Sequence, residues 1–239
     1  MTSLNYINEN DKWEFDQNVT NCFDDMLERS IPQYHVMRDA VFELGSNILE
    51  CFQIKNMLDI GCSNGINLER FIHKFGATAR FCGLDVSEPK LEEARKRFKG
   101  YIDCNLVNIR NMDLRTNFPS DIYQLVTSIL TIQFVPIEYR QQIIQSIYNS
   151  LDTNGGFIFV EKVLGNCSQL NELMINNYLK LKESNGYSKE QVLRKKIALE
   201  GVLVPVTSAW NFDLLKQAGF RKIDSFWRWM NFEGYIAIK

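Results

Sequence analysis

From residue 54 to residue 163, short apolar segments alternate with segments of helical periodicity, and this alternation restricts the possible folds most. The strand-sized apolar segments are residues 54–61, 79–85, 122–130 and 155–163, with a weaker one at 101–109. Helical periodicity covers the intervening residues 67–75, 88–100 and 138–151. We therefore predict an α/β fold, a doubly wound, Rossmann-like and mostly parallel sheet with helices on both faces.

Three segments lie outside the alternation. Residues 13–53 contain two helical patterns that are interrupted at residues 30–32, and residues 168–200 form a helical insertion that breaks at residues 185–186. Residues 220–239 hold two strand-like runs joined by a short polar turn at 231–234, which predicts a closing antiparallel hairpin. We expect one domain over residues 1–239, with 13–53 as an N-terminal helical lid and 168–200 completing the acceptor pocket.

Composition and charge exclude several function classes. The 27 Lys and Arg against 29 Asp and Glu give a net charge of −2, so no global basic field is available for a nucleic-acid backbone. The 2 histidines and 6 cysteines show no metal-ligand spacing and no Cys-x-x-Cys pair. No apolar run is long enough to span a membrane, and the first residues do not form a signal peptide. We expect a cytoplasmic protein with reduced cysteines and no metal.

The segment MLDIGCSNG, residues 57–65, contains the most informative loop. A buried strand ends near Asp59, and Gly61 and Gly65 flank a tight turn that opens a helix. Glycine allows the backbone to turn sharply and approach a ligand, and the helix that follows presents free N–H groups. Ser63 stands where the dinucleotide fingerprint Gly-x-Gly-x-x-Gly has its second glycine. The loop therefore indicates a ligand site, and a plain strand-to-helix turn is the alternative.

An acid ends the next strand and suggests which ligand this is. Asp85 stands where an acidic side chain can accept hydrogen bonds from both hydroxyls of a ribose, as in sites for NAD or S-adenosylmethionine. The alternative role is a helix cap beside Ser87. The loop lacks a phosphate-binding fingerprint and has an acid, Asp59, at its base, so it suits a positively charged ligand. Asp59 would lie near the sulfonium and ammonium groups of S-adenosylmethionine. Asp59 could equally bind loop N–H groups, and the two roles can coexist.

Several motifs together resemble one family. They are Trp13-x-Phe15-Asp16, Phe23-x-Asp25-Met26, Arg29-Ser-Ile-Pro-x-Tyr34, Gly61-Cys-Ser63, Thr131-Ile-Gln133-Phe134, Glu161-Lys162, Asn185-Gly-Tyr187-Ser188, Leu199-Glu200 and Asn231-Phe232. With the strand–helix alternation, they resemble class I S-adenosylmethionine-dependent methyltransferases, and most closely the carboxy-S-adenosyl-L-methionine synthase family. The likeness runs from Trp13 to the end of the chain.

The resemblance implies roles for individual positions. Tyr34 would close over the cofactor's amino-acid part, Gly61, Cys62 and Ser63 would line its methionine side, and Asp85 would hold the ribose. Asn108 and Ile109 stand for the family's Asp-Ile beside the adenine. Val86 and Ile129 replace family asparagines, the second near the reactive centre. Lys196 stands where the family has an arginine that grips the added carboxylate of the carboxylated cofactor.

We predict an S-adenosylmethionine-dependent transferase that methylates a small-molecule acceptor and, by the family resemblance, forms a homodimer. One alternative is a carboxy-S-adenosyl-L-methionine synthase that takes its carboxylate from prephenate and serves tRNA wobble-uridine modification. Another is a non-catalytic cofactor-binding subunit of a partner. The preference for methyl transfer depends on Lys196 and Ile129, because a lysine offers a point charge rather than the two-pronged contact of an arginine. No catalytic base is assigned, and His35, Tyr34 and Tyr187 are candidates.

Overall fold

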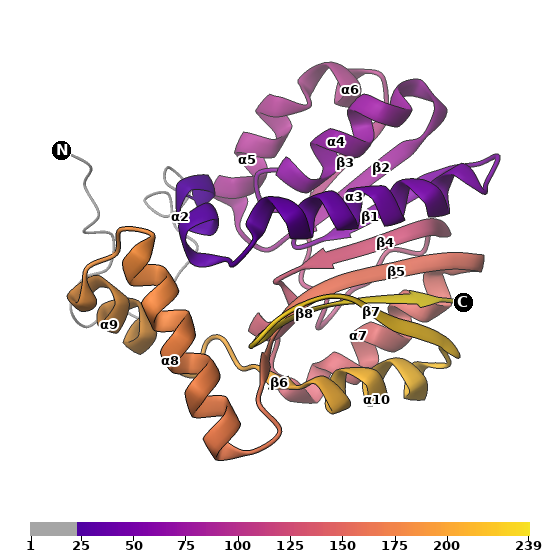
Figure 1. Cartoon of the computed structure of the whole chain (residues 1–239). Coiled ribbons are helices and arrows are strands. Elements are labelled where there is room, and N and C mark those ends of the chain that lie inside the picture. Colours follow the sequence, from indigo (N-terminus) through magenta and orange to yellow (C-terminus); the bar gives the residue numbers. More distant parts are fainter. Residues whose placement is uncertain (1–22) are drawn as a thin grey trace.

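A computed structural model describes residues 23–239 (Figure 1). The predicted lid residues 13–22, with the Trp13 motif, lie outside this range. The described chain begins with helices α2 (Phe23–Ser30) and α3 (Tyr34–Glu50), whose break coincides with the interruption expected at residues 30–32. Five strands follow, with helices after the first, second and fourth and a non-helical segment between the third and fourth: β1 (Asn56–Ile60), β2 (Arg80–Asp85), β3 (Val107–Asn111), β4 (Tyr123–Ile129) and β5 (Leu151–Leu164).

These strands form the predicted doubly wound sheet. The order is β3-β2-β1-β4-β5-β8-β7, and β1 to β5 run parallel to one another. The strands β7 (Lys222–Trp229) and β8 (Phe232–Ile238) close the sheet as an antiparallel hairpin next to β5, and the short β6 (Val206–Thr207) pairs with β5 outside this path. The strand order reverses between β1 and β4, and ligands bind at such switch points in open α/β sheets.

Helices cover both faces, because the strands are apolar on both sides. One core cluster combines α3, α4 (Ile66–Phe75) and α5 (Glu88–Arg97) with one face of the sheet. The other cluster combines α7 (Ile137–Ser150) and α10 (Ser208–Ala218) with the opposite face. Figure 1 shows these two helical layers with the sheet between them. The largest fully buried side chains include Phe71 on the first face and Phe157 on the second.

Two sequence-based boundaries were wrong. The weaker strand predicted at 101–109 begins only at Val107, because α6 (Lys99–Asp103) occupies its first part. Tyr101 and Ile102 both donate backbone hydrogen bonds to the carbonyl of Phe98 and pack on the core with it, which is helical spacing. Likewise, the turn of the closing hairpin falls at residues 230–231, before β8, rather than at 231–234.

The insertion consists of helices α8 (Ser168–Ser184) and α9 (Lys189–Ala198), separated at the break expected at residues 185–186. Figure 1 shows them projecting beyond the end of the sheet, beside α2. Short 3₁₀ turns, η1 (Gly76–Thr78) and η2 (Ile132–Phe134), follow α4 and β4. Within residues 23–239, none of the helices is both long and apolar enough to cross a membrane.

Candidate functional site

A cavity of about 870 Å³ opens at the carboxyl ends of the parallel strands, at the switch point between β1 and β4. Its floor consists of the residues that follow β1, β2, β3 and β4, and its opposite wall consists of residues from α2, α3, α8 and α9. The cavity is within the size range of small-molecule sites. We expected residues 13–53 to form a lid and residues 168–200 to complete the acceptor pocket. The described parts of both segments border the same cavity as the glycine loop.

The loop after β1 is fixed by the backbone of β2. The N–H groups of Gly61 and Cys62 both donate to the carbonyl of Leu84, at 2.7 and 2.9 Å. Gly61 has φ +70°, and a Cβ there would lie 2.1 Å from the side-chain oxygen of Thr131 in the loop after β4. Glycine is therefore required at position 61 both by its left-handed conformation and by the close approach of a second loop.

Asp85 has the position predicted for a ribose acceptor and also supports the loop. One carboxylate oxygen accepts the N–H of Ser63 at 2.9 Å, and the other accepts the N–H of Ser87 at 2.9 Å. Asp85 lines the cavity together with Ser63. Each carboxylate oxygen has a further lone pair, so the cap role and a ribose role can coexist.

Asp59 is buried, with 2% of its surface exposed, and lines the cavity. Its Oδ1 accepts hydrogen bonds from the Thr127 hydroxyl at 2.6 Å and the Asn67 amide at 2.9 Å, while its Oδ2 is buried without a partner. Burial raises the pKa of Asp59 to about 6, although both hydrogen bonds and the nearby Arg38 act in the opposite direction. A cationic group in the cavity would satisfy Oδ2 and stabilise the carboxylate.

Cys62 and Ser63 both line the cavity. Burial, with smaller contributions from Asp59 and Asp85, raises the pKa of the Cys62 thiol well above its usual value, which keeps the thiol neutral. The hydroxyl oxygen of Ser63 is buried without a hydrogen-bond partner. The loop thus presents two orphaned polar atoms to the cavity, Oδ2 of Asp59 and Oγ of Ser63, as expected of a site shaped for a polar ligand.

The structure places the two residues expected beside the adenine outside the cavity lining. Asn108 is exposed, Ile109 is buried against Gly83 within the sheet, and neither lines the cavity. Asn111 and Met112 line it instead, because β3 begins later than predicted and ends at Asn111, the partner of Asp85 in the β2–β3 register. Recognition of the helix at 99–103 would have moved the predicted strand toward Asn111, which ends β3 as Asp85 ends β2.

The remaining predicted residues come together in the cavity. Tyr34 is buried on α3, Val86 is exposed just after β2, and Ile129 ends β4. Lys196 lines the opposite wall from α9. Of the three candidate bases, Tyr34 lines the cavity, whereas His35 lies on the surface near Glu28 and Tyr187 is buried outside the lining.

The loop after β4 is held by a buried acid on β5. The carboxylate of Glu161 accepts the N–H groups of Ile132 at 3.0 Å and Gln133 at 2.7 Å, and burial raises the pKa of Glu161 to about 8. The guanidinium of Arg140 donates to the carbonyl of Gln133 at 3.1 Å and counteracts part of that shift. This arrangement fixes the segment that carries Thr131 against the glycine loop.

Sequence reasoning missed a group of lysines on the far side of the cavity. Lys162 from β5 and Lys182 from α8 line it together with Lys196 and the ring of Tyr178. Burial lowers the pKa of Lys162 and of Lys182 to about 8 each, with Lys196 and Lys162 respectively adding repulsion. A sequence signal existed, because Lys182 stands one helical turn after Tyr178 on the face that packs inward.

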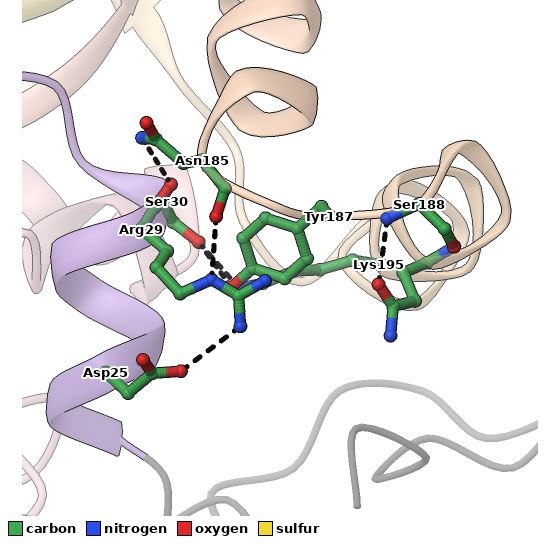
Figure 2. Close-up of polar contacts among 8 residues, drawn as sticks. Asp25, Arg29, Ser30, Asn185, Tyr187, Ser188 and Lys195 are labelled. Atoms are coloured by element: carbon green, nitrogen blue, oxygen red, sulfur yellow. Dashed lines mark hydrogen bonds and ion pairs between the residues drawn. The ribbon is translucent and has the colours of Figure 1, made fainter. Parts of the chain in front are cut away.

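A set of polar contacts attaches α2 to the turn between α8 and α9 (Figure 2). The side chain of Arg29 donates to the carbonyl of Asn185 at 2.9 Å, and the Asn185 amide donates to the carbonyl of Arg29 at 3.0 Å. The Arg29 guanidinium also stacks 4.3 Å from the ring centre of Tyr187, whose hydroxyl lies 3.1 Å from that of Ser30. Lys195 donates to the same Ser30 hydroxyl at 3.0 Å. These contacts fix the two elements that form the outer wall of the cavity.

Among residues 23–239, no group of three or more His, Cys, Asp or Glu side chains is placed to hold a metal ion. The cavity is instead lined by carboxylates and ammonium groups, which suit a polar organic ligand.

Comparisons with known proteins agree with this geometry. Residues 57–155 match a family described as a methyltransferase domain. The carboxy-S-adenosyl-L-methionine synthase of Methylococcus capsulatus is 36% identical to the chain over 232 residues, which cover 96% of the chain and 94% of that protein. The enzyme of the same name from Sulfurimonas denitrificans is 35% identical over 231 residues, 95% of each protein.

Solved structures show the same fold at low identity. Human N-acetylserotonin methyltransferase, solved in complex with S-adenosylmethionine, superposes with a TM-score of 0.61 at 13% identity and covers 93% of the chain. The DszA carbon methyltransferase gives a TM-score of 0.66 at 13% identity over 94% of the chain. The chain spans 55% and 59% of these longer chains, respectively. The class I methyltransferase fold predicted from the sequence is confirmed.

Proposed function

Because the chain belongs to the carboxy-S-adenosyl-L-methionine synthase family, we propose that it binds S-adenosylmethionine and converts it to the carboxylated form with prephenate as the carboxyl donor. Membership rests on relatives 35 to 36% identical over almost the whole chain. Bound S-adenosylmethionine would supply the sulfonium methyl group whose carbon receives the carboxyl group. The chain's own residues would bind and orient the two substrates and exclude water from them.

The residues on the sheet side fit this cofactor. In the proposed binding mode, the free Oδ2 of Asp59 accepts from the cofactor's ammonium, Asp85 accepts from the ribose hydroxyls, and Asn111 borders the adenine. Support comes from the buried and unpartnered oxygens of Asp59 and Ser63, two residues that line the cavity. Opposite charges at Asp59 and an ammonium attract each other strongly in a buried site.

The observation that favours the synthase is the cationic wall opposite the glycine loop. Lys162 lies on β5 just beyond Val160, the β5 partner of Ile129 at the end of β4, where the reactive centre is expected. Lys182 and Lys196 line the same cavity from the insertion helices. A carboxylate transferred next to a sulfonium needs such cationic partners in a water-poor site, and Lys196 alone offers only a point charge.

Methyl transfer to a small molecule is the second candidate, and Ile129 favours it. This apolar residue stands at the end of β4, where the family has an asparagine. Methyl transfer requires alignment of the acceptor, the methyl carbon and the sulfur more than any particular acid or base. An anionic methyl acceptor would also be attracted by the lysines. The same pocket therefore suits both candidate functions, and their products distinguish them.

Mass spectrometry of the products separates the two functions. The purified protein is incubated with S-adenosylmethionine and prephenate, and the nucleoside products are identified by mass. Carboxy-S-adenosylmethionine that forms only when prephenate is present would support the proposal. Intact S-adenosylmethionine after prolonged incubation would contradict it. S-adenosylhomocysteine formed with a methylated small molecule would favour the second candidate.

Cofactor binding should weaken in acid because Asp59 is protonated there. Below its pKa of about 6, the ligand-free protein holds a neutral Asp59, which cannot pair with an ammonium. We expect the dissociation constant for S-adenosylhomocysteine to be about tenfold larger at pH 5 than at pH 7. Calorimetric titration measures this change, and 5′-methylthioadenosine, which lacks the amino-acid part, should bind equally at both pH values. If the dissociation constants of both ligands changed by the same factor between pH 7 and pH 5, Asp59 would be excluded as the partner of the ammonium.

Lys196 and Ile129 should influence which of the two cofactors the protein prefers. An arginine at 196 and an asparagine at 129 would add a two-pronged contact and a polar neighbour for the added carboxylate. We expect Lys196→Arg combined with Ile129→Asn to bind the carboxylated cofactor about five- to tenfold more tightly relative to S-adenosylmethionine. Competitive binding of the two cofactors tests this. An unchanged ratio would mean that these positions do not contact the added carboxylate.

The homodimer and the cytoplasmic location remain part of the proposal, because both depend on the family resemblance and on the sequence alone. Light scattering of the purified protein would test the dimer, and an elution mass of one chain, 27.9 kDa, would contradict it.

A further inference from the structure

The helical side of the cavity contains two ammonium groups beside one aromatic ring. The Nζ atoms of Lys182 and Lys162 lie 4.7 and 4.9 Å from the ring centre of Tyr178. Tyr178 and Lys182 are buried on α8, with 7% and 5% of their surfaces exposed, while Lys162 comes from β5 and is half-buried. All three residues line the cavity.

Neither ammonium has an anionic partner among the described residues. The acids that line the cavity are Asp59, Asp85, Asp113 and Glu200, and none of them forms an ion pair with Lys162 or Lys182. Attraction to the Tyr178 ring offsets only part of the cost of burying two like charges close together. The pKa of each lysine is accordingly lowered to about 8, by burial first and by a neighbouring lysine second.

This arrangement is unfavourable for the empty protein and favourable for an anion. Two desolvated ammonium groups that repel each other lose that repulsion when a carboxylate lies between them. Lys196 belongs to a different element, α9, and is exposed, whereas the lysine pair belongs to β5 and α8, although the charge of Lys196 adds repulsion at Lys162. The contacts between α2 and the α8–α9 turn hold the C-terminal end of α8, which carries Lys182, beside α2 (Figure 2).

We propose that Lys162 and Lys182, whose ammonium groups both contact the ring of Tyr178, form an anion subsite that binds a carboxylate of the second substrate. The inference rests on the proposed function, since it assigns to the pair the substrate that arrives beside the bound cofactor. Lys196 then remains available for the carboxylate carried by the cofactor. The pair acts in binding and positioning, and the ring of Tyr178 holds the two ammonium groups at a fixed distance from each other.

Binding in an inert complex tests the subsite without catalysis. The protein is saturated with S-adenosylhomocysteine, which has no transferable methyl group, and prephenate is titrated calorimetrically. Lys162→Met and Lys182→Met keep most of each stem's volume and remove the charge, so each should weaken prephenate binding about tenfold or more. The affinity for S-adenosylhomocysteine itself should stay within about twofold. Lys180→Met, on the exposed side of α8, is the matched control and should change neither affinity.

Thermal stability separates a binding role from a structural one. If the lysines are held for an anion, removing either charge relieves repulsion, and the ligand-free variants should melt no lower than the wild type. If the contacts with Tyr178 are structural, both variants should melt lower, with prephenate affinity unchanged, and that combination would overturn the proposal. Lys182→Arg retains the charge and should recover part of the lost affinity.

A wild-type complex that does not bind prephenate would contradict the proposed donor rather than the subsite. Malonate is then the probe for the lysine pair, at constant ionic strength. Malonate binding that is lost in both methionine variants and kept in Lys180→Met would support the subsite. Malonate that binds to the wild type and the variants alike, or to none of them, would refute it.

Discussion

Replacing Gly61 with alanine should reduce the affinity for S-adenosylhomocysteine by about 100-fold or more. The residue has φ +70°, which costs a residue with a Cβ about 1–2 kcal/mol. The new Cβ would also lie 2.1 to 2.7 Å from three atoms of the Thr131 side chain, so the loop after β4 must move. Forcing an extra methyl group into a packed site costs about 1–3 kcal/mol more, and both loops border the cofactor end of the cavity.

Two variants separate the causes of this loss. Gly76 also has a positive φ, +48°, but no atom lies within 4 Å of a Cβ there, so Gly76→Ala carries the conformational cost alone and should leave cofactor affinity unchanged. Thr131→Ala in the Gly61→Ala background removes the two nearest atoms and should recover part of the affinity. If Gly61→Ala binds S-adenosylhomocysteine as tightly as the wild type, the loop does not touch the ligand.

Local sequence signals were sufficient to identify residues that line the glycine-loop side of the cavity. Asp59, Gly61 and Asp85 each stand at or just after the end of a predicted parallel strand, and the carboxyl ends of such strands meet at one edge of the sheet. The fold fixes their neighbourhood once the strand order is known. For that reason the sequence could indicate which side chains face one cavity, and the structure places all three there.

The strand that carries the residues expected beside the adenine was started too early in the sequence-based prediction. Tyr101 and Ile102 are apolar and were read as strand residues, but they pack with Phe98 as a helical turn. The strand was expected to end at residue 109, whereas β3 ends two positions later, at Asn111. Short apolar stretches do not distinguish a strand from a helical turn by periodicity alone.

The lysine wall could not be read from the sequence because it depends on tertiary structure. Lys162 and Lys182 are twenty residues apart and belong to a strand and an insertion helix. Only the packing of α8 against residues of β5 and β8 brings both lysines to the Tyr178 ring, which also makes an edge-to-face contact with Phe232. The expectation of methyl transfer rested on Lys196 and Ile129. Three cavity-lining lysines provide the cationic environment that a single one does not, which is why we propose the synthase.

Replacing Asp85 with alanine should weaken S-adenosylhomocysteine binding by about 1.5–3 kcal/mol, or about 10- to 150-fold. The carboxylate accepts the N–H groups of Ser63 and Ser87, so its loss leaves the loop without support as well as the ribose without an acceptor. Asp121→Ala, an exposed acid that does not line the cavity, is the control and should bind normally.

The two contributions of Asp85 can be separated with a ligand that lacks the ribose hydroxyls. If the carboxylate binds the ribose, Asp85→Ala should lose much more affinity for S-adenosylhomocysteine than for its 2′,3′-dideoxy analogue, because only the first ligand offers hydroxyl donors. Asp85→Asn keeps an acceptor oxygen without the charge and should fall between the wild type and the alanine variant for the natural ligand. Equal losses of affinity for both ligands would show that Asp85 acts only by accepting the N–H groups of Ser63 and Ser87. Its role would then be that of a cap and not of a ribose acceptor.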